Sequence, residues 1–215
     1  MIDDPNTNDN RSYVYTECEQ YRDEYPIIES MISMNARVID LGCGNGSLLK
    51  LLKDKKNING CGIEISQSGV NICLEKKLDV WKTPIDELLI ECDNKKFDYA
   101  ICNVTIQMVM YPEILLSEMK RIAKYQIVSF PNFGHLANRL DMLIHGRMPR
   151  PFLFGYQWYN TGHIHQLSVN DFKELIKKNN MEIIKQVHFG WGITKLFRNQ
   201  FPNLFATESI YMLRG

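Results

Sequence analysis

The chain has 215 residues, of which 45% are hydrophobic and 23% are charged, as is ordinary for one soluble globular domain. Basic and acidic residues number 25 each, so the formal net charge is zero. This balance argues against a dedicated nucleic-acid binder, which usually has a basic face. No apolar run approaches the roughly 20 residues needed to span a membrane. We therefore expect neither a nucleic-acid nor a membrane partner.

The N-terminal segment and the cysteines are the features that bear on the cellular compartment. Residues 1–16 are polar, lack the apolar core of a signal peptide and are expected to form a flexible tail. The six cysteines form no C-x-x-C pair, which predicts reduced, mostly buried thiols in a cytoplasmic protein. Cys43 has no histidine near it in sequence that could activate it, so we expect it to pack rather than react.

Hydrophobic periodicity predicts strands that alternate with helices. The expected elements, in chain order, are a helix over 17–33, a strand over 37–41, a helix over 47–56, a strand over 59–64, a helix over 66–77, a strand over 78–82, a helical turn over 85–90, a strand over 97–103, a helix over 112–123, a strand over 125–130, a helix over 168–180, and strands over 181–189 and 209–213. This alternation, followed by two closing strands, predicts a doubly wound α/β sheet. Residues 17–215 are expected to form a single domain.

The regular pattern breaks over residues 131–167. The stretch from Pro131 to Gln166 contains four glycines, three prolines, four histidines and many aromatics. A long irregular segment in a compact domain is usually a lid or a binding insertion, so we expect this one to cover an acceptor site. A second apolar stretch, over 191–205, is expected to form a hairpin that joins the last two strands and serves as an interface or covers a strand edge.

A glycine-rich loop follows the first predicted strand, in the run Val38-Ile39-Asp40-Leu41-Gly42-Cys43-Gly44-Asn45-Gly46. Eighteen residues after Gly46, the second predicted strand ends in Glu64. A strand, a tight glycine turn, a helix and a strand-end carboxylate are typical of a nucleotide-cofactor site. Dinucleotide folds use Gly-x-Gly-x-x-Gly, and Ser47 replaces that third glycine. The loop therefore disfavours an NAD-linked oxidoreductase.

This form of the loop resembles motif I of the class I S-adenosylmethionine-dependent methyltransferases. That cofactor has no phosphate, so the loop needs close backbone approach, which glycine permits because it lacks a Cβ and tolerates positive φ. The resemblance implies that Gly42, Gly44 and Gly46 bind the cofactor. Asp40 is expected to orient the loop and the ligand's ammonium group. Glu64 is expected to accept hydrogen bonds from two ribose hydroxyls.

Later segments narrow the resemblance. They are Phe97-Asp98, Thr105-x-Gln107, Ser129-Phe130-Pro131-Asn132-Phe133-Gly134-His135, Gly146-Arg147-Met148-Pro149, Tyr156-Gln157-Trp158-Tyr159-Asn160-Thr161, Ile164-His165 and Phe201-Pro202-Asn203-Leu204. Together with the glycine loop, they closely resemble the methionine biosynthesis protein MetW family. The resemblance implies the seven-stranded, mostly parallel methyltransferase sheet with its last strand antiparallel. It also implies a role beside homoserine O-acyltransferase in making methionine.

One position departs from the pattern of such methyltransferases. They often place an acid after the third strand, where it hydrogen-bonds the adenine amino group, and that position aligns with Pro84 here. Asp86 is the candidate replacement, with backbone groups alone as the alternative. Asn103 and Gln107 delimit the loop after the fourth predicted strand. They are expected to pass the methionine part of the cofactor and to bind it.

The acceptor is expected to enter over the carboxyl ends of the strands. The candidate bases are His135, His163 and His165, whose ordinary pKa of about 6.5 suits proton abstraction near neutrality. For each, a histidine that only bonds loop backbone is the competing interpretation. The His-x-His spacing of His163 and His165 also suggests a metal site. No third ligand stands at metal-site spacing, so we predict no metal.

The predicted acceptor-binding residues are Asn132, Arg139, Arg147, Tyr156 and Tyr159. The arginines suit a carboxylate or phosphate on the acceptor, or a partner's acidic surface; solvated charges are the alternative. The aromatics suit an acceptor wall, or they pack the lid onto the sheet.

The sequence thus predicts an S-adenosylmethionine-dependent methyltransferase with S-adenosylhomocysteine as its product. Its acceptor would be a small polar or anionic molecule, in methionine or surface-carbohydrate biosynthesis. The alternative is a non-catalytic or sensing partner subunit of homoserine O-acyltransferase. The sequence assigns no oligomeric state.

Overall fold

The computed structural model describes residues 21–85, 92–150, 158–159, 162–192 and 194–215. The strands are β1 (Arg37–Leu41), β2 (Asn59–Glu64), β3 (Asp79–Lys82), β4 (Phe97–Asn103), β5 (Ala123–Pro131), β6 (Glu182–His188) and β7 (Glu208–Arg214). The helices of the described ranges are α1 (Tyr25–Met31), α2 (Ser47–Lys56), α3 (Gln67–Glu75), α5 (Pro112–Ile122), α6 (Leu136–His145), α7 (Val169–Lys178), α8 (Thr194–Phe197) and α9 (Pro202–Phe205).

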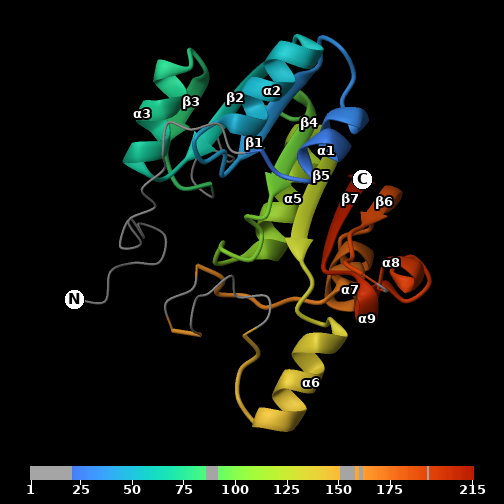
Figure 1. Ribbon diagram of the computed structural model, residues 1–215. Helices are drawn as coiled ribbons and strands as arrows, with labels where there is room; N and C mark the ends of the chain where they lie inside the picture. Colours follow the sequence, from blue (N-terminus) through green and yellow to red (C-terminus); the bar gives the residue numbers. More distant parts are fainter. Residues whose placement is uncertain (1–20, 86–91, 151–157, 160–161, 193) are drawn as a thin grey trace.

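Within the described residues, the strands form one seven-stranded sheet in the order β3-β2-β1-β4-β5-β7-β6 (Figure 1). Strands β1 to β5 pair in parallel, whereas β7 is antiparallel to both of its neighbours. This arrangement confirms the predicted doubly wound, mostly parallel sheet. The strand order reverses between β1 and β4, and cofactors bind beside the carboxyl ends of strands at such a switch point. The loops after β1 and β4 are therefore the first place to look for a site.

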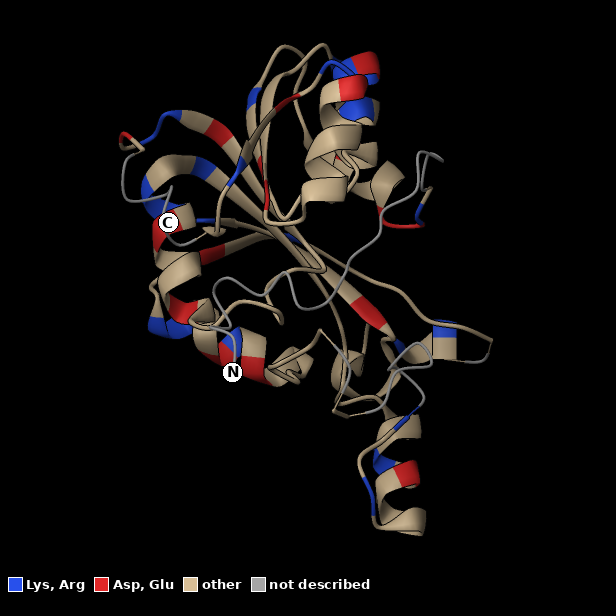
Figure 2. Ribbon diagram, turned by 90° about the vertical axis from the view of Figure 1, so that its left-hand side faces the viewer, with Lys and Arg blue, Asp and Glu red and all other residues tan. Residues whose placement is uncertain are grey.

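The outer helices display charged residues of both signs, interspersed along the chain (Figure 2).

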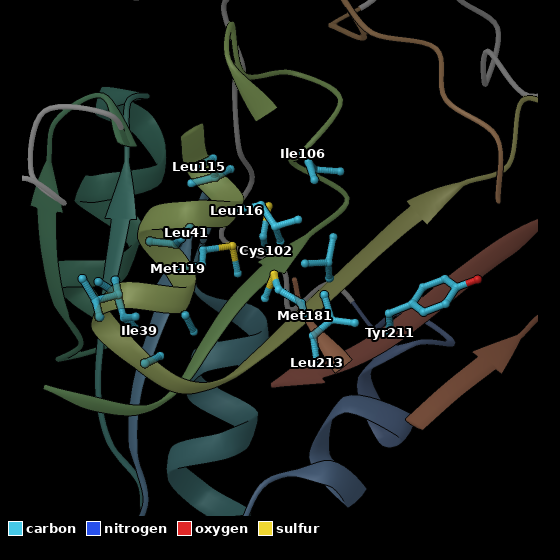
Figure 3. Packing of buried hydrophobic residues seen from close by; sticks show 14 of the residues in the cluster. Ile39, Leu41, Cys102, Ile106, Leu115, Leu116, Met119, Met181, Tyr211 and Leu213 are labelled. Carbon is cyan, nitrogen blue, oxygen red and sulfur yellow. The ribbon is translucent and has the colours of Figure 1, made fainter. Parts of the chain in front are cut away.

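The sheet has helices on both faces. Helices α1 and α2 pack on one face through residues such as Ile28 and Leu49. Helices α5 and α7 pack on the other through residues such as Met119 and Phe172. Figure 3 shows α5 side chains packed over Leu41 and its neighbours. Burial on both faces explains the nearly continuous apolar runs of the central strands.

The structure differs from the expected elements at three places. Helix α1 begins at Tyr25, so residues 21–24 of the helix expected over 17–33 are not helical, and residues 17–20 lie outside the described residues. Pro26 stands in its first turn, where the missing N–H costs no hydrogen bond. The expectation of an irregular segment over 131–167 is wrong over α6, an ordered ten-residue helix. The apolar stretch between β6 and β7 forms two short helices, α8 and α9. The helical turn expected over 85–90 lies, beyond its first residue, outside the described residues.

Ser168 caps the start of α7 with a capping box, in which its side chain and that of Asp171 each accept the other's backbone N–H. Among the described residues, no helix has both the length and the apolar character that crossing a membrane requires.

Candidate cofactor site

The glycine loop after β1 depends on three left-handed backbone positions. Gly42, Gly44 and Gly46 have φ of 79°, 59° and 73°, a region that side-chain-bearing residues rarely adopt. The backbone N–H groups of Gly42 and Cys43 both donate to the carbonyl of Ile63, at 2.9 and 3.0 Å. These bonds tie the loop to β2. The sequence therefore builds a tight turn whose backbone is open to close approach.

Close packing also favours glycine at Gly42 and, on β2, at Gly62. A Cβ on Gly42 would lie 2.7 Å from the side chain of Thr105, which belongs to the loop after β4. A Cβ on Gly62 would lie 2.5 Å from the sulfur of Cys43, so β2 leaves room for that side chain. Cys43 is buried, with its sulfur 3.9 Å from that of Cys73, and its pKa is raised by this contact and by burial. The thiol packs behind the loop.

Glu64, at the end of β2, shapes the same loop. It is buried, and its two carboxylate oxygens accept the N–H groups of Gly44 and Ser66, both at 2.8 Å. Burial raises the pKa of Glu64, and these backbone hydrogen bonds oppose that rise. Each carboxylate oxygen has more than one acceptor position. The glutamate can therefore hold the loop and still accept a hydroxyl on each oxygen, as a ribose requires.

Asp40, at the end of β1, is only 2% exposed. Within the described part of the chain, its Oδ1 is buried and has no hydrogen-bond partner. Burial and the negative charge of Glu64 raise the pKa of Asp40 to about 7. A buried carboxylate without a partner is costly. The position therefore fits a ligand that brings a donor with positive charge, such as an ammonium group.

Asp40 also selects against a dinucleotide. An acid at the position of Glu64 binds a ribose hydroxyl in dinucleotide-binding proteins as well, but a buried carboxyl group beside the glycine turn would disfavour pyrophosphate there. A cofactor that is cationic, has ribose hydroxyls and lacks phosphate matches these residues. S-adenosylmethionine has all three properties, so the residues present fit it.

The loop after β4 faces the glycine loop and begins at Asn103. Its amide donates to Glu24 at 3.3 Å, and its Oδ1 accepts from the hydroxyl of Ser129 at 2.6 Å. The next residue, Val104, has φ of 55°, which is strained for a β-branched side chain. Ser129 holds it there by accepting the Val104 N–H at its carbonyl (3.1 Å) and its hydroxyl (3.0 Å). These bonds fix the start of the loop to β5, and Thr105 in the same loop lies beside Gly42.

Gln107 joins three segments. Its side chain is fully buried and donates to the carbonyl of Pro131 at 3.1 Å. The backbone carbonyl of Gln107 accepts the N–H groups of Ile164 and His165, both at 3.0 Å. The residue therefore connects the loop after β4 to the end of β5 and to the returning insertion. The cofactor contacts of Asn103 and Gln107 stay predictions, and Asp86 lies outside the described residues.

Asn132 and His135 follow β5. The amide of Asn132 is buried, donates to the carbonyl of Ala206 at 2.8 Å and accepts from Gly134 N–H at 3.0 Å. The Nδ1 of His135 accepts the N–H of Ala137 at 3.0 Å and so caps α6, and burial lowers the pKa of this histidine. Both side chains thus brace the loop after β5. Their predicted roles toward an acceptor stay predictions.

His163 and His165 lie on the returning part of the insertion. The ring of His163 meets Phe133 edge-on, with centroids 6.1 Å apart. The Nε2 of His165 is 3.1 Å from the carbonyl oxygen of Met110. These contacts place the two histidines between the loops after β4 and β5. Across the described ranges, His, Cys, Asp and Glu side chains form no group of three or more suited to a metal ion.

The other predicted acceptor residues that the structure describes are Arg139, Arg147 and Tyr159. Arg139 is on α6 and donates from Nε to the carbonyl of Gly134 at 2.7 Å. Arg147 lies 3.5 Å from Asp141. Tyr159 is 67% exposed, and Tyr156 lies outside the described residues. Helix α6 projects from the end of the sheet (Figure 1). No contact links these side chains to the cofactor loop among the described residues.

Two carboxylates that the sequence did not indicate lie at this edge of the sheet. Glu24 is buried just before α1 and binds Asn103. Glu208 begins β7 opposite Pro131, and its pKa is raised to about 8 by burial and by the charge of Glu24. No local motif marks either residue. They meet because antiparallel β7 starts at the edge where the parallel strands end.

The strand order, the glycine loop after β1 and the acid ending β2 define the class I S-adenosylmethionine-dependent methyltransferase fold. A methyltransferase of this kind from Archaeoglobus fulgidus superposes with a TM-score of 0.63 at 17% identity, covering 89% of this chain and 94% of that one. A methyltransferase from Mesorhizobium loti superposes with a TM-score of 0.62 at 12% identity, covering 89% of this chain and 97% of that one. The cyclase SpnF superposes with a TM-score of 0.63 at 15% identity, covering 88% of this chain and 78% of that one. Likeness at such identity shows the fold alone.

The family model described as methionine biosynthesis protein MetW matches residues 22–213, and the chain belongs to this family. A curated relative is the bifunctional methionine biosynthesis protein MetXA/MetW of Rhodopirellula baltica, 32% identical over 200 residues. The match covers 87% of this chain but only 32% of that relative. The chain therefore spans about a third of the length of this relative.

Proposed function

We propose that the chain binds S-adenosylmethionine at the glycine loop and transfers its methyl group to a small polar or anionic acceptor. Methionine or surface-carbohydrate biosynthesis is the proposed setting. The observation that supports this best is the buried carboxylate of Asp40, whose Oδ1 lacks a partner among the described residues. In this proposal Asp40 binds the cofactor's ammonium group and Glu64 binds its ribose. The bound cofactor supplies an electrophilic methyl group.

The chain's own contribution is alignment and proton removal. The rigid loops after β4 and β5 would orient the acceptor, and alignment can supply at best about 7 to 11 kcal/mol. A hydroxyl acceptor must also lose a proton. We propose His165 as the first base to test, because its Nε2 lies against the carbonyl of Met110. In the neutral ring Nε2 then holds the proton and Nδ1 is the basic atom.

Transfer of a labelled methyl group tests the proposal. The protein would be incubated with methyl-labelled S-adenosylmethionine and a polar metabolite extract, and labelled product and S-adenosylhomocysteine should appear in equal amounts. The His165→Gln variant should lower the rate by about 10²- to 10⁴-fold while cofactor affinity stays constant. His145→Gln, on α6, is the matched control and should leave the rate unchanged. Label that never leaves the cofactor would reject catalysis.

A second function is favoured by a specific observation. The Rhodopirellula relative is named for two modules, MetXA and MetW, in one chain. Fold alone does not determine a reaction, as the cyclase among the structural neighbours illustrates. We therefore also propose that the chain supports a homoserine O-acyltransferase and that cofactor occupancy regulates this support. Adding the chain should raise acylation by the purified acyltransferase, and Glu64→Ala should reduce the effect. An acyltransferase that is fully active alone would contradict it.

A further inference from the structure

Helix α6 has its amphipathicity inverted. Its large apolar side chains Leu136, Leu140, Leu143 and Ile144 are 36%, 45%, 79% and 71% exposed. The buried residue of the helix is instead the polar Asn138, whose amide donates to the carbonyl of Phe133 at 3.1 Å. Single exposed apolar residues are common on protein surfaces. Packing among the residues that the structure describes does not explain a helix that buries an amide and exposes its leucines.

The four apolar residues form one continuous stripe. They stand at positions i, i+4, i+7 and i+8, which share one face of a helix. Asn138 lies about 175° around the helix from the centre of that face, given 3.6 residues per turn. The stripe therefore points away from the body of the protein. Both views show α6 projecting beyond the sheet (Figures 1 and 2).

The helix is also fixed at both ends without help from a partner. His135 caps its start. Gly146 ends it with φ of 60° and donates its N–H to the carbonyl of Met142 at 2.8 Å. Asp141 then accepts the backbone N–H of Arg150 at 3.1 Å, which holds the chain beyond the helix. Because the stripe is already ordered, a partner that binds it need not supply the free energy of folding the helix.

Charge around the stripe selects the occupant. Residues 136–150 contain three arginines and one aspartate, a net charge of two positive in a chain whose overall charge is zero. In a symmetric dimer, two such segments would face each other with like charge, which disfavours a second copy. A partner with an apolar groove and an acidic rim would fit both the stripe and the arginines.

We propose that α6 is the docking helix for homoserine O-acyltransferase, with the stripe seated in an apolar groove of that enzyme. This inference depends on the partner role proposed above. The fused relative supports it, because one chain that joins MetXA and MetW holds the two modules at high local concentration. The partner would then lie beside the loop after β5, near the side where an acceptor would enter.

Binding of the purified acyltransferase from the same organism to the full chain tests the proposal. The double variant Leu143→Glu with Ile144→Glu should weaken binding by at least about 100-fold, as loss of a central apolar anchor does. Met142→Glu is the matched control on another face of α6, and Leu196→Glu is the control on α8. These residues are 46% and 72% exposed, so neither change should affect folding or binding.

Each other outcome overturns the inference in a distinct way. Equal binding by the double variant, or loss through Leu196→Glu instead, would place the docking surface elsewhere while the partner role stands. No binding by the unmodified chain would reject the partner role, and a parallel titration with S-adenosylmethionine would show whether the cofactor proposal survives. A dimer that the double variant dissociates, or loss of binding to anionic lipid vesicles with acyltransferase binding unchanged, would assign the stripe to a second copy or to a membrane surface.

Discussion

Replacing Asp40 by asparagine should make the cofactor-free protein more stable and bind S-adenosylmethionine more weakly. In the folded chain Asp40 is buried beside Glu64, and its pKa rises from 3.8 to about 7. The unfolded carboxyl ionises near its ordinary value, whereas the folded one retains its proton until about pH 7. Stability is therefore lost as the pH rises from about 4 to about 7, and an asparagine, which cannot ionise, does not lose it.

The size of the effect follows from the shift in pKa. Each unit corresponds to 1.36 kcal/mol, so about three units cost the folded protein at most about 4 kcal/mol above neutrality. From about pH 5 to about pH 8, the free energy of unfolding of Asp40→Asn should rise relative to wild type by about 2 to 3 kcal/mol. Loss of a charged hydrogen bond to the ammonium group should weaken cofactor binding by about 10- to 100-fold.

Urea unfolding of both proteins at several pH values, after removal of bound cofactor, measures this difference. Taking the difference between the two proteins cancels the titrating groups that do not interact with Asp40, which leaves Asp40 and its neighbour Glu64. A difference that is constant with pH would refute the assignment of a raised pKa to Asp40. Unchanged affinity for S-adenosylmethionine would refute its proposed role at the ammonium group.

Further predictions test the loop and the fold. Gly42→Ala should abolish cofactor binding in calorimetry, because its Cβ would lie 2.7 Å from Thr105. Gly146 also has a left-handed backbone, but open space surrounds the position of a Cβ there. The Gly146→Ala variant should therefore lose only about 1 to 2 kcal/mol of stability and keep cofactor binding intact. Ser168→Ala removes a helix cap and should cost about 1 kcal/mol in urea unfolding, without effect on the cofactor. Burial lowers the pKa of His188 to about 4, so wild type should lose stability as the pH falls from about 6.5 to about 4. His188→Gln should remove that slope, and a slope that persists would contradict the assignment.

The central strands could be predicted from sequence alone because local signals mark both ends. Strands β1, β2 and β4 have the expected bounds, since apolar runs there stop at glycines or at polar turn residues. The glycine loop could be located for the same reason. Its spacing reports a backbone requirement, and the structure shows that requirement as positive φ and close packing.

Helix α6 was missed because a prediction from amphipathicity assumes that apolar faces turn inward. The spacing of Leu136, Leu140 and Leu143, with Gly146 as a stop, was the signal present in the sequence. Glu24 and Glu208 could not be located at all. They are 184 positions apart, and only the antiparallel insertion of β7 beside β5 brings them to one edge.

The most direct test of the cofactor site is titration calorimetry with S-adenosylmethionine and S-adenosylhomocysteine on wild type and Glu64→Ala. Wild type should bind one molecule of either ligand. The variant should bind at least about 100-fold more weakly, because it loses the ribose acceptor and the bond that holds Gly44. Circular dichroism would verify that the variant is folded. Absence of binding to wild type, or equal binding by folded Glu64→Ala, would contradict the account.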